Sequence, residues 1–233
     1  MSYATGQTYE MESATLKPLL SGEEIRAFSL VHSGLWILFP YDLSGPQPTL
    51  RSEKSLKTTY PGAWKYLKEC EDRLRARERG KMDGPGWWAF GRNQNLDQFE
   101  QPKVMLPGYN DKPAAALDNE GRFYHVSGYS LTLKPDATIS LPVLAALLNS
   151  RLLFWILMKQ GVALQRGFVE FRPQYLDKLP IAIPNSEQRR ALERIAQRAV
   201  KEGYDNVKAD LNEIVYKLYG LTDEEIAIVE GRK

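Results

Sequence analysis

Four consecutive polar residues follow an aromatic segment in the middle of the chain, and their side chains could read the edges of base pairs. They are Arg92, Asn93, Gln94 and Asn95. Arginine forms two hydrogen bonds with guanine, and asparagine or glutamine forms two with adenine, each pair giving about 1–3 kcal/mol of base discrimination. Considered alone, a polar turn that closes a hairpin explains the same four residues at least as well.

We predict that residues 87–90 form an aromatic strand in front of this cluster, because three of the four side chains are aromatic. Lys103 stands at the far end of the same stretch, at the start of a further predicted strand. There it is a candidate DNA-binding residue.

A basic segment precedes the cluster. Between Tyr60 and Gly80, apolar residues recur at helical spacing, and the outer faces are rich in Lys and Arg, including Arg75 and Arg79. Such a helix could neutralise DNA phosphates in a salt-dependent way, which sets position on the duplex but not sequence preference. The acidic residues interleaved in the segment leave ion pairs within the helix as an equally good interpretation.

A third candidate segment runs from Arg166 to Tyr175, where basic and aromatic residues alternate around a glycine. Arg166 and Arg172 could approach a nucleic-acid backbone from an extended chain. An edge strand with charged residues on its outer side has the same pattern.

Residue patterns for catalysis are missing from the sequence. It contains no Asn-Pro-Pro-Tyr or Asp-Pro-Pro-Tyr motif, no Gly-x-Gly turn after a strand, and no Gly-x-Ser-x-Gly. His32 and His125 lack the partners of a zinc site, and the single cysteine, Cys70, excludes an internal disulfide. We therefore expect no catalytic residue and no metal ligand in this chain, and a reducing cytoplasmic setting.

Both strands and helices are predicted to position these side chains. Short strands are predicted at 35–39, 103–106, 122–126 and 130–133, with a hairpin tip at 118–121. Capping boxes at Ser21–Glu24, Asn185–Gln188 and Thr222–Glu225 predict helix starts. The expected class is α+β, a mixed, mostly antiparallel β core followed by a helical C-terminal region. We place a β-rich domain at 1–184 and a helical tail at 185–233.

Charge is concentrated in the middle of the chain although the net charge is only +2. Residues 51–103 contain 12 Lys and Arg against 8 Asp and Glu, and residues 121–184 contain 7 against 3. This distribution suits a polyanion. The most apolar stretch, 141–158, is interrupted by Pro142, Asn149 and Arg151, so we predict a buried core helix and no membrane partner.

Several short motifs, in order along the chain, resemble the C-terminal specificity domain of TaqI-type DNA adenine-N6 methyltransferases and type IIG restriction-modification enzymes. The opening segment 16–28, the strand Trp36–Tyr41, the helix that begins at Tyr60, and residues 87–94 and 102–107 match in sequence. Further along, the Leu-Asn-Ser helix at 147–152, the Leu-Pro-Ile exit at 179–184 and the segment 215–226 match as well.

The resemblance implies a function in sequence-specific recognition of double-stranded DNA, with chemistry carried out elsewhere. An N-terminal methyltransferase domain of the bacterial parent enzyme would bind S-adenosylmethionine and flip the target adenine. Some parents add a nuclease that uses Mg²⁺. The alternatives are a specificity subunit that docks separate catalytic chains and a stand-alone DNA-acting enzyme. The resemblance does not assign the base-reading residues, so their assignment follows from side-chain chemistry alone.

Overall fold

The computed structural model describes residues 1–161 and 167–232 and divides the chain into two compact units. Unit 1 consists of residues 1–19 and 34–99, and unit 2 of residues 20–33 and 100–233. The helices that follow Asn185 belong to unit 2. The functional division that we placed at residue 184 stays a prediction.

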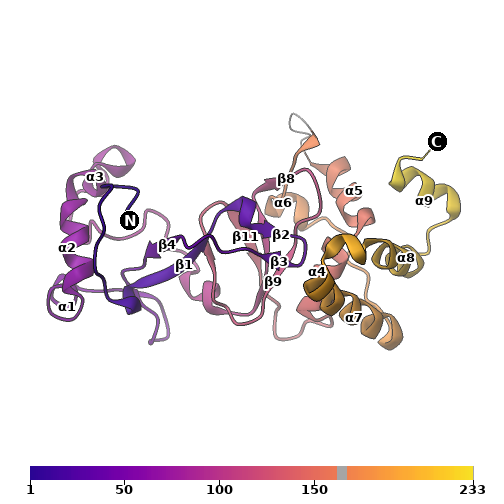
Figure 1. The fold of residues 1–233 in the computed structure, drawn as a ribbon, viewed down its shortest axis with the longest axis horizontal. Helices are drawn as coiled ribbons and strands as arrows, with labels where there is room; N and C mark the ends of the chain where they lie inside the picture. The colour runs from indigo at the N-terminus through magenta and orange to yellow at the C-terminus, as the bar shows by residue number, and fades with distance from the viewer. Residues whose placement is uncertain (162–166, 233) are drawn as a thin grey trace. The chain divides into compact units, whose positions relative to one another are not determined.

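Unit 1 combines short antiparallel strands with a run of helices (Figure 1). Strand β1 (Leu16–Leu20) pairs with β4 (Trp36–Leu38), and β5 (Tyr41–Asp42) pairs with β6 (Thr49–Leu50). The helices are α1 (Glu53–Thr59), α2 (Pro61–Glu69) and α3 (Glu71–Arg75), followed by the 3-10 turns η3 (Arg77–Gly80) and η4 (Leu96–Glu100).

Three tryptophans pack together in the core of unit 1. The ring of Trp64 on α2 lies 5.8 Å from that of Trp87 and 5.7 Å from that of Trp88, between ring centroids. Leu56 and Leu67 are buried in the same cluster. Trp88 Nε1 donates a hydrogen bond to the carbonyl of Arg51 over 3.1 Å, so its polar atom is satisfied.

The predicted strand at 87–90 is wrong. Residues 85–88 form a turn, which begins at Pro85 and passes through Gly86 at a φ of +78°. Consecutive side chains of a strand point to opposite faces, yet Trp87 and Trp88 both pack on Trp64. A turn lets both rings face the same core.

The basic segment is helical but broken. The predicted helix divides into α2 and α3 at Cys70, whose backbone (φ −95°, ψ 1°) leaves the helical range. The segment ends at Glu78 and Arg79, which both have a positive φ.

Unit 2 is built on a buried antiparallel sheet in which β7 (Lys103–Pro107) is central. It pairs with β11 (Gly128–Leu131) and with β9 (Ala116–Asp118). Two-stranded pairs are formed by β2 (Ile25–Arg26) with β3 (Ser29–Leu30), and by β12 (Val169–Glu170) with β8 (Tyr109–Asn110). Residues 118–121 do form a turn, but the strand that follows, β10 (Tyr124–His125), is not part of the sheet of β9.

The helices of unit 2 pack on one another, and one of them packs on this sheet. They are α4 (Leu141–Leu148), α5 (Arg151–Gln160), α6 (Pro173–Leu176), α7 (Ser186–Glu202), α8 (Lys208–Tyr219) and α9 (Asp223–Glu230). Helix α4 contacts β7, β9 and α7. The expected α+β class, with antiparallel sheets and a helical C-terminal region, is confirmed.

The apolar stretch 141–158 forms two helices that meet at an angle of 65°. Among the described residues, no single helix has the length and apolar composition needed to cross a membrane; α4 and α5 reach both only when they are taken together across the bend. Asn149 lies fully buried at the bend, where it accepts from the backbone N–H of Ala115 (2.9 Å) and donates to the Ala115 carbonyl (2.7 Å). Ser150 then caps α5 by accepting from Leu153 N–H.

The capping boxes predicted at Asn185 and Thr222 are confirmed. Asn185 caps α7 with Gln188 reaching back, and Thr222 caps α9 with Glu225 reaching back. The box at Ser21 is also present, but it opens only the three-residue 3-10 turn η2 (Gly22–Glu24).

Glu24 gives the stability of unit 2 a dependence on acid pH. Burial would raise the pKa of its carboxyl, but hydrogen bonds from the backbone N–H groups of Ser21 and Ser33, both 2.6 Å, outweigh burial and lower the pKa to about 2. Because the pKa of this carboxyl is lower in the folded than in the unfolded state, its ionised form stabilises the fold at pH values above the unfolded-state pKa. That stability is lost as the pH falls through the folded-state pKa.

We expect Glu24→Gln to lower the free energy of unfolding at pH 7 by up to about 3 kcal/mol. The difference from wild type should shrink as pH falls from 4.5 towards 2, because the wild-type carboxyl becomes protonated. Urea denaturation of both proteins across this range measures it. A difference that is constant with pH would contradict this role of the carboxylate.

Candidate nucleic-acid interface

The predicted base-reading loop lies at the surface of unit 1. Arg92, Asn93, Gln94 and Asn95 are all exposed. Within the described part of the chain, none of their side chains forms a hydrogen bond or an ion pair with another residue. Asn95 has a φ of 56°, in the left-handed region that asparagine tolerates. The four side chains are therefore free to bind a partner.

Buried aromatic residues anchor the loop on its N-terminal side. The backbone N–H of Phe90 donates to Tyr41 Oη over 2.8 Å, and the Phe90 ring lies 5.2 Å from that of Tyr41 and 5.8 Å from that of Phe39. On the other side, Leu96 is buried at the start of η4. An exposed loop between two fixed ends suits recognition, because less conformational entropy is lost on binding.

Arg77 holds the backbone in front of the loop. Its guanidinium donates to the carbonyl oxygens of Trp87 (2.7 Å) and Ala89 (2.9 Å), and to that of Leu74 (2.8 Å). Sequence reasoning did not single out this residue, because a structural arginine looks the same in sequence as its exposed basic neighbours.

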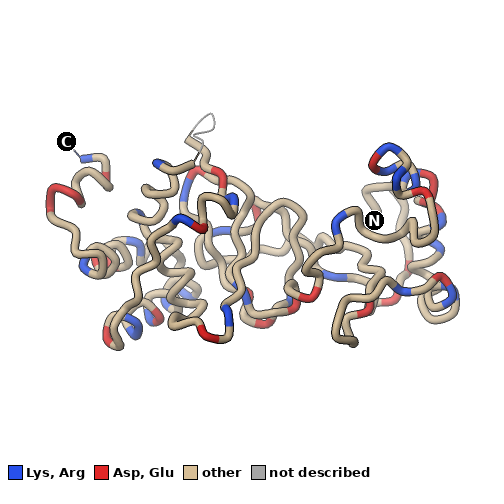
Figure 2. The backbone as a smooth tube through the Cα atoms, turned by 180° about the vertical axis from the view of Figure 1, so that it is seen from behind, with Lys and Arg blue, Asp and Glu red and all other residues tan. Residues whose placement is uncertain are grey.

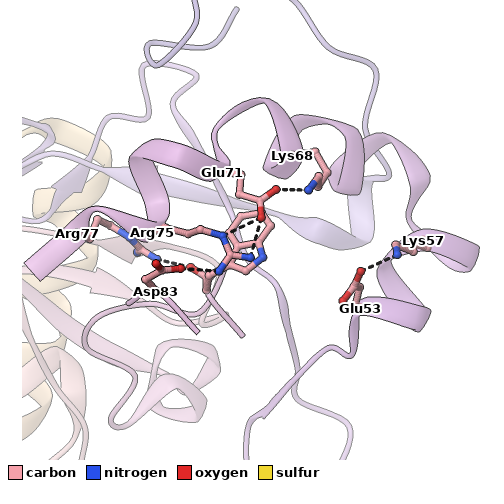
Figure 3. Close-up of polar contacts among 8 residues, drawn as sticks. Glu53, Lys57, Lys68, Glu71, Arg75, Arg77 and Asp83 are labelled. Carbon is pink, nitrogen blue, oxygen red and sulfur yellow. Dashed lines mark hydrogen bonds and ion pairs between the residues drawn. The ribbon is translucent and has the colours of Figure 1, made fainter. Parts of the chain in front are cut away.

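Arg75 lies between two carboxylates and is only partly available to DNA (Figure 3). Its guanidinium lies 2.7 Å from Glu71 and 2.9 Å from Asp83, and it stacks 5.2 Å from the centroid of the Trp87 ring. Glu71 also pairs with Lys68. The ion-pair interpretation of the basic segment therefore describes Arg75, and its contact with phosphate stays a prediction that requires exchange of these partners.

Arg79 differs from Arg75. Its side chain is exposed at the end of the basic segment, and within residues 1–161 and 167–232 no hydrogen bond or ion pair engages it. Figure 2 shows that both basic and acidic positions occur along α2 and α3 before this point. Arg79 is the better candidate for a phosphate contact.

Lys103 requires a correction. Its side chain has no exposed surface, and its Nζ lies 2.6 Å from Asp118 Oδ2 across the pair of strands β7 and β9. Burial lowers the pKa of Lys103, and Asp118 opposes that change. A residue in this position stabilises the interior and is not accessible to DNA, because the ion pair fixes it between strands.

The third predicted segment is only partly described. Arg166 lies outside the described residues. Arg172 is exposed beside the short strand β12, and its Nε lies 2.9 Å from Glu170 Oε2. The edge-strand interpretation fits this arrangement, and a phosphate contact by Arg172 stays a prediction.

The described residues contain no cluster of three or more His, Cys, Asp or Glu side chains that could hold a metal ion. His125 is turned into unit 2, where its Nε2 lies 2.8 Å from Ser130 Oγ. Burial, with a smaller contribution from Lys103, lowers the pKa of His125 to about 4. His32 packs against the ring of Phe123.

Comparison with known proteins shows the family. Residues 17–181 match the family model described as the TaqI-like C-terminal specificity domain. The chain therefore belongs to the TaqI-like C-terminal specificity domains of restriction-modification enzymes. The family expected from the sequence motifs is confirmed.

One sequence relative and one solved structure are similar to this chain. The chain is 22% identical over 224 residues to the Type II methyltransferase M.BstVI of Geobacillus stearothermophilus. The aligned residues cover 96% of this chain and 37% of that protein. The fold of this chain is similar to that of the type IIL restriction-modification enzyme MmeI, solved in complex with DNA, with a TM-score of 0.59 and 15% identity over 92% of this chain and 29% of that one. The chain thus spans about a third of the length of these relatives.

Proposed function

We propose that this chain recognises a specific sequence in double-stranded DNA, as the target-recognition domain of a restriction-modification adenine-N6 DNA methyltransferase. The observation that carries the proposal is the anchored loop Arg92–Asn95. It presents four side chains capable of base readout, exposed and without partners among the described residues. Family membership supports a role in specificity.

Bases and phosphates are contacted by different residues in this proposal. Arg92, Asn93, Gln94 and Asn95 read base edges, while Arg79, Arg172 and Arg75 contact the backbone, in that order of availability. Backbone contacts supply affinity that depends on salt, and base contacts supply the choice of sequence.

Chemistry is assigned to a separate N-terminal methyltransferase domain of the parent protein. That domain supplies S-adenosylmethionine chemistry to a flipped adenine, and a type IIG parent adds a nuclease that uses Mg²⁺. The name of M.BstVI, a Type II methyltransferase of greater length, supports this arrangement.

Selection from a randomised pool of duplexes tests the proposal. We expect the full chain to enrich one short sequence. A variant in which residues 92–95 are all serine should still bind duplex DNA, but without enrichment, because its phosphate contacts remain. Absence of enrichment by the wild-type chain would refute sequence recognition. Methylation or cleavage by the chain alone, supplied with S-adenosylmethionine and Mg²⁺, would refute the non-catalytic role.

A further inference from the structure

Helix α7 carries a row of cations that the proposed DNA-reading loop does not involve. We define the α7 basic stripe as Arg190, Arg194 and Lys201, with the neutral Gln197 between them. At 3.6 residues per turn, positions 190, 194, 197 and 201 fall within about 60° of arc on one face. All four residues are exposed.

The opposite face of α7 fixes the direction of the stripe. Leu192, Ile195, Ala196 and Ala199 are buried in the main core of unit 2, where α7 packs on α4 and α8. The helix is 17 residues long and begins at a complete capping box. The stripe therefore lies on a rigid helix and faces away from the core.

Three other cations of the C-terminal helices form ion pairs within the protein, and Arg189 donates a hydrogen bond to the carbonyl of Thr138. Arg198 pairs with Glu202 and Asp210, Lys208 with Asp205, and Lys217 with Glu213. By contrast, within the described ranges Arg190, Arg194 and Lys201 form no ion pair and no side-chain hydrogen bond. The acidic residue on this face, Glu187, stands at its N-terminal end.

Like charges four residues apart, such as Arg190 and Arg194, slightly destabilise a helix unless a partner neutralises them. The stripe extends for about 16 Å at 1.5 Å per residue. Duplex DNA presents a negative charge about every 1.7 Å along its axis, so it can offer a phosphate to each of the three cations. Segment 185–233 as a whole is slightly acidic, so the helix, and not the composition, gathers these charges.

We propose that the α7 basic stripe binds the phosphate backbone of duplex DNA outside the recognised sequence. This inference rests on the proposed function. It assigns a sequence-independent contact to a helix that lies beyond the region matched by the family model, residues 17–181. Because only charge and position matter for such a contact, lysine should replace arginine in the stripe without loss.

The test compares the full chain with Arg190→Gln/Arg194→Gln/Lys201→Gln, by titration with duplex DNA at several salt concentrations. Each lost phosphate contact reduces the slope of log K against log salt by about 0.9. We therefore expect the slope to fall by about 2–3. Affinity for cognate and random duplexes should fall by the same factor, on the order of tenfold.

The matched control is Arg122→Gln/Lys208→Gln/Lys217→Gln, which removes the same charge from three exposed, ion-paired cations of unit 2. It should retain the wild-type slope, as should Arg190→Lys/Arg194→Lys. A stripe variant with wild-type slope and affinity overturns the inference alone. A wild-type chain that binds no DNA overturns the proposed function as well.

Thermal unfolding shows whether the stripe variant is folded. Should the triple variant be unfolded, the single variant Arg194→Gln, which also relieves repulsion with Arg190, carries the test. Its slope is expected to fall by about 1, and an unchanged slope overturns the inference.

Discussion

Replacing Lys103 with methionine is expected to lower the free energy of unfolding by about 3–5 kcal/mol, because it leaves a buried carboxylate without its cation. The side chains of Lys103 and Asp118 are 0% and 2% exposed, and 2.6 Å separates Nζ from Oδ2. Asp118 would keep the hydrogen bonds from the backbone N–H groups of Arg122 and Phe123. Those two dipoles replace only part of the interaction with a full charge. Urea denaturation at pH 7 measures the loss.

Two further variants separate charge from packing at this position. Lys103→Met/Asp118→Asn should be more stable than Lys103→Met, since the neutral amide needs no counterion and its oxygen still accepts from the turn. Lys208→Met removes a cation from the exposed pair with Asp205 and should change stability by no more than about 0.5 kcal/mol. If Lys103→Met were as mild as Lys208→Met, the buried pair would not stabilise unit 2.

The second large effect concerns DNA discrimination. We expect Arg92→Ala to weaken binding to the cognate duplex by about 1–3 kcal/mol, roughly fivefold to 150-fold, and to relax the preference at one base pair. Binding to random duplexes should change little in comparison. The loop anchors at Phe90 and Leu96 are untouched, so the fold should be unaffected. Competition titrations with duplexes substituted at each position measure the profile.

Arg79→Ala is the matched control, since it removes the same charge from another exposed arginine of unit 1 that has no partner among the described residues. Because Arg79 is proposed to contact a phosphate, Arg79→Ala should weaken binding to all DNA sequences alike. It should also reduce the slope of log K against log salt by about 1. Arg75→Ala should act in the same direction but less strongly, because Glu71 and Asp83 already neutralise Arg75. Equal losses on cognate and random DNA for Arg92→Ala and Arg79→Ala would contradict the division between readout and phosphate contact.

Local signals in the sequence predicted local structure well. The capping boxes at Asn185 and Thr222 start helices where expected, because the hydrogen bonds that define a cap join residues three apart. Strands β4, β7, β10 and β11 overlap the stretches predicted from β-forming residues between turns. The order of short motifs was also sufficient to predict the family.

Contacts between residues that are far apart in the sequence decided the features that local signals did not predict. The pairing of Lys103 with Asp118 depends on strand register, which places residues 15 apart in sequence side by side and removes both from water. Asn149, seen in the sequence as part of a motif and as an interruption of the apolar stretch, joins the bend between α4 and α5 to the backbone of Ala115. Neither relation leaves a periodic pattern that sequence reasoning could detect.

The sequence alone determined the class of fold, the starts of α7 and α9, the family and the composition of the loop Arg92–Asn95. Tertiary structure decided which basic residues are available: Lys103 is buried, Arg75 lies between carboxylates, and Arg79, Arg92 and the α7 basic stripe remain exposed. The physical reason is that the availability of a charge depends on which groups surround it in space. That is fixed only when strands pair and helices pack.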